Sequence, residues 1–314
     1  MPLNQPSDKP SAPAAAPDSP ARPVCTADLA PLARAILPGA TYDYIAAGSE
    51  DQVTVRDNTA AFARIKLLPP ILHGVSTADT ATTVLGLPVS LPVLSAPMSC
   101  MAMFHREGAL AVARAAAAER TVFAHSSGAG HSVEQVAQAT DAPWWFQLYV
   151  PADRDVTRKL VQRAERAGCK AIIITVDLGE RKDADLRNDF SLPKGLLLKM
   201  MHDVGHTHLT DELSYDELIA FARQSWHLSL TWEFFDWLRG QTDLPLLIKG
   251  VLGPPDALKA VLVGRPCAYG LAVDGEQGVR RVLQILREEL TNGMIAAGCP
   301  TVAAIKPTLI ARDR

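Results

Sequence analysis

The stretch that decides the fold is Trp144-Trp145-Phe146-Gln147-Leu148-Tyr149-Val150, an apolar and aromatic run with two polar side chains near its end. Residues two apart in a β-strand point to the same side of the sheet. Gln147 and Tyr149 should therefore share a face. The run predicts a strand that presents an amide and a phenol to one cavity.

Similar runs recur along the chain, each short, apolar and polar at its C-terminal end. They are Leu91–Ser99, Thr121–Ser127, Ala171–Asp177, Leu244–Gly250 and Val261–Pro266. Helical patterns lie between most of them, including an alanine-rich segment over 107–119 and a capping box from Ser132 to Gln135. Apolar strands alternating with helices are typical of a parallel sheet covered by helices.

The polar groups stand repeatedly at the C-terminal ends of the strands. This favours an α/β fold of the (β/α)8 barrel type, with its site on that face, over a flat doubly wound sheet. Six strands can be counted, and a closed barrel of this class needs eight. The sequence therefore predicts a barrel truncated to about six βα units.

The chain has 314 residues, of which 48% are hydrophobic and 21% charged, enough for one barrel domain and a tail. Residues 1–25 are rich in proline and alanine and are predicted to be a disordered tail, with the barrel over 26–314. The segment 65–72 should be extended and cover one end of the barrel. Over 194–228 the helical pattern is lost, which predicts a mobile loop or lid.

Several classes of function are disfavoured by composition. A net charge of -3 gives no nucleic-acid footprint, and no apolar run reaches the ~18 residues of a membrane span. Five scattered cysteines without a CxxC pair predict reduced thiols and a cytoplasmic protein, and the C-terminus carries no SKL-type tripeptide. His202, His206 and His208 lack the spacing of a metal motif, so no metal is expected. A homo-oligomer is left open.

Taken together, the runs resemble the FMN-dependent α-hydroxy acid oxidases and dehydrogenases, of the glycolate, lactate and mandelate oxidase types. The matching runs include YDYIAAGSED (42–51), LSAPMS (94–99), WFQLYV (145–150), RAERAGCKAIIITVD (163–177), LPLLIKGV (244–251) and VLVGRP (261–266). The resemblance implies an FMN cofactor and a small (S)-2-hydroxy acid substrate that is oxidised to the 2-oxo acid.

The resemblance also assigns roles to single residues. Tyr44 matches a tyrosine that helps to bind the substrate carboxylate, and Tyr149 one near the substrate hydroxyl. Lys182 stands where the family has a second carboxylate-binding arginine, although lysine lacks the bidentate fork. Gly128 stands where some members carry a bulky aromatic side chain, which hints at room for a larger, aryl hydroxy acid.

The implied cofactor residues form four groups. Backbone along the flavin is expected at Ala96, Pro97 and Met98. Hydrogen bonds to the ring edge are expected from Ser126, Gln147 and Thr175. A cation near flavin N1 is expected at Lys249, and part of the phosphate site at Gly264 and Arg265.

The main departure from the family lies between Ala260 and Val261, where two further βα units are expected and roughly 60 residues are absent. One missing piece carries the SNHGGRQ motif, with the catalytic histidine and an arginine that clamps the carboxylate. The other carries the DGGxR phosphate loop. No catalytic residue can be assigned, because all eight histidines precede Lys249. They are His73, His105, His125, His131, His202, His206, His208 and His227.

Loss of two units should leave the barrel open, unless the 261–266 strand moves next to the 244–250 strand. Two hypotheses follow. The first is FMN-dependent 2-hydroxy acid oxidation, impaired by loss of the base, and the alternative is a non-catalytic remnant or interaction protein of the same fold.

Overall fold

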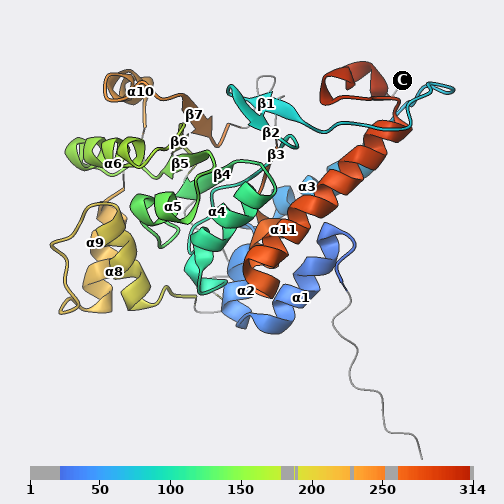
Figure 1. Cartoon of the computed structure of the whole chain (residues 1–314). Helices are drawn as coiled ribbons and strands as arrows, with labels where there is room; N and C mark the ends of the chain where they lie inside the picture. The colour runs from blue at the N-terminus through green and yellow to red at the C-terminus, as the bar shows by residue number, and fades with distance from the viewer. Residues whose placement is uncertain (1–21, 178–186, 188–189, 227–229, 252–260, 312–314) are drawn as a thin grey trace, which may run out of the picture.

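The computed structural model describes residues 22–177, 187, 190–226, 230–251 and 261–311 (Figure 1). Its centre is a six-stranded parallel sheet, and all six predicted strands are present. In chain order they are β3 (Val93–Ser95), β4 (Phe123–Ser126), β5 (Trp144–Leu148), β6 (Ile172–Thr175), β7 (Leu246–Lys249) and β8 (Val261–Val263). The spatial order is β7-β6-β5-β4-β3-β8.

The sheet is open. β8 pairs with β3, with Val93 opposite Val261 and Leu94 opposite Leu262, so β7 and β8 form the two edges. Of the two outcomes expected from the sequence, the strand at 261–263 therefore stays beside β3 and does not move next to β7. Apolar side chains are exposed on both edges, at 62% for Val261, 43% for Leu262 and 37% for Ile248.

The strands have two distinct faces, as strand alternation requires. The inner face carries the cluster of Leu94, Ala124, Trp145 and Ile173. The outer face carries residues that pack against the helices, namely Phe123, Phe146, Leu148, Ile172 and Ile174. All five residues of β5 are buried, as expected for the stretch that predicted the fold.

A short antiparallel hairpin covers the inner cluster. It consists of β1 (Thr82–Val84) and β2 (Leu87–Val89), and Val84 and Val89 join the inner cluster. The segment 65–72, expected to be extended and to cover one end of the barrel, is extended, but it is exposed and pairs with the C-terminal region, where the Leu68 amide donates to the Leu309 carbonyl at 2.7 Å. The hairpin covers the inner cluster in its place. Strands of only three residues give too short an alternation to be recognised from sequence.

Helices surround the outer face and the ends of the sheet (Figure 1). They are α1 (Leu29–Ile36), α2 (Gly39–Ala46), α3 (Val53–Arg64), α4 (Gly108–Ala118), α5 (Val133–Ala139), α6 (Arg154–Arg166), α8 (Lys194–Asp203), α9 (Tyr215–Gln224), α10 (Trp232–Arg239) and α11 (Arg265–Ala296). Short 3-10 helices lie at Thr26–Asp28, Met101–Met103, Val302–Ala304 and Pro307–Leu309. None of the described helices has the length and apolar character needed to cross a membrane.

The segment expected to be a loop over 194–228 contains two helices, α8 and α9. Leu197, Met201 and Val204 are buried and are spaced by four and three residues, so they form an apolar stripe. Interspersed lysines and histidines hide this stripe in the sequence. α9 begins with a capping box between Ser214 and Glu217.

The long helix α11 crosses the molecule beside α4 and α1 (Figure 1). It bends at Asp274 and Gly275, where φ and ψ are not helical. Its second half is fixed by the buried carboxylate of Glu119, which follows α4. Arg280, Gln284 and Arg287 all donate hydrogen bonds to this carboxylate, at 3.2, 2.9 and 2.8 Å.

Candidate flavin site at the carboxyl edge of the sheet

Four of the predicted cofactor residues form one polar row across the ends of neighbouring strands. The row consists of Ser126 on β4, Gln147 on β5, Thr175 on β6 and Lys249 on β7. Ser126 lies opposite Gln147 and Thr175 lies opposite Lys249 in the strand register. Paired residues of parallel strands point the same way, so the row stands on the inner face, directly above the inner cluster.

Hydrogen bonds connect the row. The Ser126 hydroxyl donates to Gln147 Oε1 at 2.6 Å, and Gln147 Nε2 donates to Thr175 Oγ1 at 2.8 Å. The three side chains are buried, and their residues are 0%, 1% and 5% exposed. An amide nitrogen carries two hydrogens and a threonine hydroxyl one. Within the described chain, the second Gln147 hydrogen and the Thr175 hydroxyl hydrogen have no acceptor, so the row offers donors to a ligand.

Lys249 ends the row with an ion pair. Its Nζ lies 3.0 Å from Oδ1 of Asp177, and both side chains are about 40% exposed, at 40% and 43%. The sequence analysis named Lys249 but gave Asp177 no role. The signal was present, because Asp177 follows Thr175 by two residues and Thr175 pairs with Lys249. A carboxylate beside the cation was therefore predictable from strand alternation.

The turn after β3 meets the turn after β8. The Ala96 amide donates to the Val263 carbonyl at 3.0 Å. A Cβ on Gly264 would lie 3.7 Å from the Cβ of Ala96, which is ordinary contact. The residues Ala96, Pro97 and Met98 are thus placed beside Gly264, as the resemblance implies for two parts of one cofactor site.

Arg265 is held by backbone carbonyls. Its Nε donates to the Ile45 carbonyl at 2.9 Å and its Nη2 to the Ala47 carbonyl at 3.3 Å. Two of the five guanidinium hydrogens are therefore committed to the end of α2, and three remain. The buried donors of Gln147 and Thr175 are of the kind that a flavin ring edge accepts, and Gly264 and Arg265 remain the described residues to which the resemblance assigns part of the phosphate site.

A pocket of about 250 Å³ opens beside these turns and is lined by Tyr44, Met98, Phe104, Gly264 and Arg265 among others. Tyr44 stacks on Phe190 with ring centroids 4.5 Å apart. The sequence analysis gave Phe190 no role. The pocket brings together residues assigned to the substrate and to the cofactor.

Tyr149 lies just beyond the end of β5. Its hydroxyl accepts a hydrogen bond from Ser99 Oγ at 3.3 Å, and Ser99 also lines the pocket. Its ring makes an edge contact with Trp226, with centroids 6.1 Å apart. Lys182, the third residue assigned to the substrate, lies outside the described residues.

The space expected beside Gly128 is filled. A Cβ on this residue would lie 2.8 Å from Ser99 Oγ and 3.5 Å from the Met200 methyl group. The Cβ position of Gly128 is therefore occupied by these two side chains, and room for a larger substrate stays a prediction. α8, which the sequence analysis missed, supplies Met200.

No described histidine lines this pocket or hydrogen-bonds to the polar row. His125 is the one nearest in sequence to a row residue, but it faces outward among Phe123, Trp144 and Phe146. One of its ring nitrogens, Nε2, lies 3.0 Å from the His131 carbonyl. Burial lowers the pKa of His125 to about 3, so the ring is neutral at ordinary pH. It packs the outer core and does not face the site.

Comparison with known proteins agrees with the geometry. A sequence model described as FMN-dependent dehydrogenase matches residues 33–261 and, separately, 258–312. Glycolate oxidase 3 of Oryza sativa subsp. indica is 37% identical, over 90% of this chain and 94% of that protein. 2-Hydroxyacid oxidase 1 of Homo sapiens is 35% identical, over 92% and 97%.

Solved structures give the same picture. A mutant of the active chimera of (S)-mandelate dehydrogenase superposes with a TM-score of 0.82 at 26% identity, covering 92% of this chain and 99% of that one. Lactate oxidase of Pediococcus acidilactici superposes with a TM-score of 0.78 at 26% identity, covering 92% and 94%.

The comparisons also locate the missing segment. The match to the rice enzyme spans 350 aligned positions but covers 90% of 314 residues, about 283, so about 67 positions have no counterpart in this chain. The two family matches meet near 258–261, between the two edge strands. The polar row, the paired turns and the relatives lead to one conclusion: this chain belongs to the FMN-dependent dehydrogenase family and lacks an internal segment between β7 and β8.

Proposed function

We propose that this protein binds FMN at the carboxyl edge of its open sheet and oxidises 2-hydroxy acids, if at all, only slowly. The buried polar row carries this proposal. Its donors from Gln147 and Thr175 have no acceptor within the described chain, and leaving buried donors unpaired costs about 1–3 kcal/mol each. A ring edge rich in acceptors, such as that of a flavin, would satisfy them.

FMN, when bound, supplies the acceptor for two electrons. The residues of this chain bind and orient the ring. The hydrogen bond from Ser126 fixes the orientation of the Gln147 amide, and Gln147 in turn fixes Thr175. The remaining hydrogens of Gln147 and Thr175 are therefore already oriented before a ligand binds. Lys249 places a cation at the end of the row, where it would stabilise negative charge on the reduced ring.

The proposed substrate class is a small 2-hydroxy acid. It rests on the names of the relatives, glycolate oxidase and 2-hydroxyacid oxidase, on Tyr44 in the pocket lining, and on Tyr149, which is hydrogen-bonded to the lining residue Ser99. Both tyrosines offer hydroxyl groups suited to a carboxylate or an alcohol. Lys182 would add a cation.

No described histidine is placed to act as the general base for such a substrate. A base must lie within hydrogen-bond reach of the proton that it removes, about 2.6–3.2 Å. Seven histidines are described, none of them at the pocket or the row, and His227 lies outside the described residues. Loss of a positioned base typically costs 10²- to 10⁴-fold in rate. We therefore expect turnover at least about 100-fold below that of an intact relative.

FMN binding tests the proposal. Quenching of flavin fluorescence would be titrated for the wild type and for Thr175→Val, which keeps the shape of the side chain and removes its hydroxyl. Loss of one buried hydrogen bond should weaken binding by about tenfold. Thr83→Val, the same change at an exposed position of β1, should leave the affinity unchanged.

Either of two results would reject the proposal: no saturable quenching by the wild type, or equal affinities of the wild type and Thr175→Val. Thermal melts of both variants show whether the fold is preserved.

A second candidate function is favoured by one observation. Apolar side chains are exposed along both edge strands, at Ile248, Val261 and Leu262. Such edges suit a non-catalytic interaction protein of the same fold. If the protein does not bind FMN and its self-association rises with concentration, the result would favour the non-catalytic interaction protein. Under either proposal we place the protein in the cytoplasm, because all five cysteines are free.

A further inference from the structure

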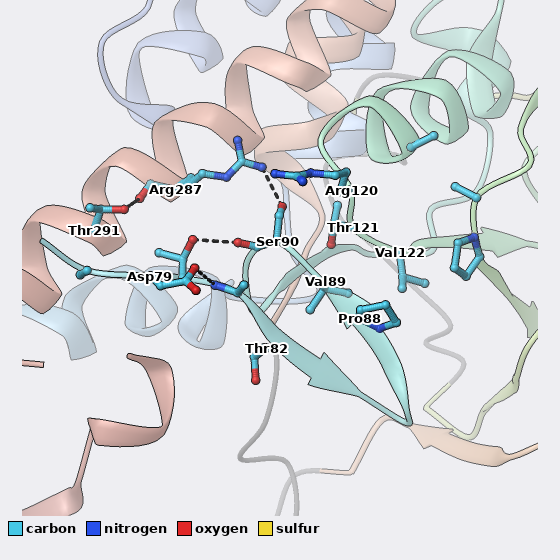
Figure 2. Close-up of a pocket in the computed structure, with 16 residues that line it drawn as sticks. Asp79, Thr82, Pro88, Val89, Ser90, Arg120, Thr121, Val122, Arg287 and Thr291 are labelled. Atoms are coloured by element: carbon cyan, nitrogen blue, oxygen red, sulfur yellow. Dashed lines mark hydrogen bonds between the residues drawn. The ribbon is translucent and has the colours of Figure 1, made fainter. Parts of the chain in front are cut away.

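A second cavity lies at the opposite end of the sheet from the polar row. Its volume is about 700 Å³, within the range of small-molecule sites. It opens between the β1–β2 hairpin, the turn after α4 and the second half of α11 (Figure 2). Its apolar lining includes Val89, Val122, Ala117 and Pro143. The cavity is thus separate from the proposed flavin site.

Two arginines enter this cavity and meet at Ser90. The Ser90 amide donates to the Arg120 carbonyl at 2.9 Å, and Arg287 Nη2 donates to the Ser90 hydroxyl at 2.9 Å. Figure 2 shows the two side chains extending from opposite sides toward Ser90. Both arginines therefore line the cavity beside Ser90, which contacts the side chain of Arg287 and the backbone of Arg120.

The charges around the cavity do not balance. Glu119, which does not line the cavity, pairs with both Arg280 and Arg287, and Asp79 is the one acidic residue among those that line it. Asp79 uses Oδ1 to accept the Ala81 amide at 2.9 Å. Of the two lining arginines, Arg287 is thus paired with Glu119, and Arg120 has no carboxylate partner among the described residues. The guanidinium of Arg120 is exposed and has no hydrogen bond or ion pair with any described side chain.

The backbone of Arg120 is strained. Its φ is 52°, in the left-handed region, which costs a residue with a side chain roughly 1–2 kcal/mol. Glycine would adopt this conformation freely. This conformation ends α4: Arg120 directly follows the C-cap residue Glu119, and the Thr121 amide donates to the Ala116 carbonyl at 2.9 Å, as at many helix C-termini. What marks Arg120 as a ligand residue is therefore its place in the lining of the cavity and its unengaged guanidinium.

We propose that this cavity binds a small organic oxyanion, a carboxylate or a phosphate ester with a compact apolar body. Its charged end would pair with the Arg120 guanidinium, because guanidinium groups bind both kinds of oxyanion through paired hydrogen bonds. Arg287 is held by Glu119 and Ser90 and stands beside the charged end as a neighbouring cation. Its apolar part would contact Val89, Val122 and Pro143. The site does not depend on flavin binding or on turnover.

Calorimetric titration of the full-length protein with benzoate, phenyl phosphate and inorganic phosphate tests the proposal. The two organic anions should bind more tightly than inorganic phosphate, because only they fill the apolar lining. The tighter of the two identifies the charged group that the site prefers. Arg120→Gly should weaken this binding at least about tenfold and should not lower the melting temperature, because it relieves the left-handed strain.

Arg120→Gly removes both a positive charge and a left-handed backbone strain, and two control variants separate these effects. Leu85→Gly relieves a similar left-handed residue, with φ 49°, in the hairpin turn and keeps Arg120. Arg106→Gln removes an exposed arginine near the other end of α4. Both should bind the organic anions as the wild type does, and Arg120→Lys should recover part of the affinity.

Three outcomes would overturn the proposal. One is the absence of saturable binding of all three anions. Another is equal binding by the wild type and Arg120→Gly, which would place the anion elsewhere. The third is tighter binding of inorganic phosphate than of both organic anions.

Discussion

At the scale of single residues, burial and strand alternation decide which polar groups can act. Gln147 and His125 both lie on apolar strands, but Gln147 points inward with a free donor and His125 points outward into the helical layer. Their different roles follow from one alternation of the chain. Ser126 and Gln147 are opposite each other only because β4 and β5 pair in that register.

Replacement of His125 by phenylalanine should flatten the dependence of stability on pH. In the unfolded chain the ring takes up a proton below about pH 6.5, and in the folded protein only below about pH 3. The unfolded state therefore binds more protons between these values, and stability falls as pH falls. His125 should therefore lower the free energy of unfolding by about 1.4 kcal/mol for each unit that the pH falls in this range. In His125→Phe this contribution to the pH dependence is absent.

Urea denaturation of both proteins between pH 6.5 and 4.5 measures the difference. Parallel plots of unfolding free energy against pH would contradict the buried, neutral histidine. The variant should also lose about 1 kcal/mol at pH 7, because the contact with the His131 carbonyl is removed.

The residues of the site could be predicted from the sequence, but the side chains and carbonyls that contact them could be predicted only in part. Ser126, Gln147, Thr175 and Lys249 stand at the ends of recognisable strands, so their common edge followed from the fold. The Tyr44 stack on Phe190 and the capture of Arg265 by two carbonyls depend on how α2 and the segment before α8 pack. Such long-range contacts leave no local pattern in the sequence.

At the scale of secondary-structure elements, Glu119 determines how α11 is held against the sheet. Burial alone would raise the pKa of its carboxyl, but hydrogen bonds from Arg287, Gln284 and Arg280 outweigh burial and lower the pKa. Its side chain is only 6% exposed. Removal of this charge leaves Arg280 and Arg287 without their acidic partner.

Glu119→Gln should therefore destabilise the protein by about 3 kcal/mol at pH 7. Because the folded-state pKa is lowered from 4.5, this contribution is present above pH 4.5 and is lost as pH falls below it. The stability difference between wild type and variant should shrink in the same window. Urea denaturation at pH 7, 5 and 4 measures it.

Glu288→Gln is the matched control, because Glu288 pairs with Arg281 on the same helix but its side chain is 61% exposed. It should cost less than about 1 kcal/mol. Equal losses from both variants would show that the Glu119 cluster does not anchor α11.

Helix prediction succeeded where caps and apolar spacing agreed. The capping box at Ser132 marked the start of α5, and the structure shows both of its hydrogen bonds. The same signature at Ser214 and Glu217 would have located α9, had it been applied there. α8 begins after Pro193 without a side-chain cap, so its start had no such signal.

At the scale of the whole molecule, the open sheet follows from the missing segment. All six strands of the central sheet are parallel, and β8 keeps its pairing with β3, so the gap falls entirely between β8 and β7. The number of strands was predictable from the runs. The position of β8 was not, because pairing of an edge strand depends on partners far away in the chain.

Lysine at an edge position should reduce self-association. Val261 is 62% exposed on an unpaired edge, and a charge there disfavours pairing with another chain. Val261→Lys should therefore raise the concentration at which the protein associates and leave the melting temperature nearly unchanged. Sedimentation velocity over a range of concentrations measures this effect.

Ile36→Lys is the control, because Ile36 is 56% exposed but lies on α1, away from both edges. If it suppresses association as strongly as Val261→Lys, the effect is one of general solubility and not of the open edge.

The central claim is that this family member keeps its flavin-binding edge but has, among its described residues, no histidine base to take the proton from the substrate as FMN oxidises it. The most direct test is anaerobic mixing of the FMN-loaded protein with glycolate, L-lactate or mandelate, followed by flavin absorbance, with an intact glycolate oxidase alongside. We predict that FMN stays bound and is reduced at least about 100-fold more slowly than in the intact enzyme. Reduction at a comparable rate, or FMN that separates from the protein on desalting, would contradict the account.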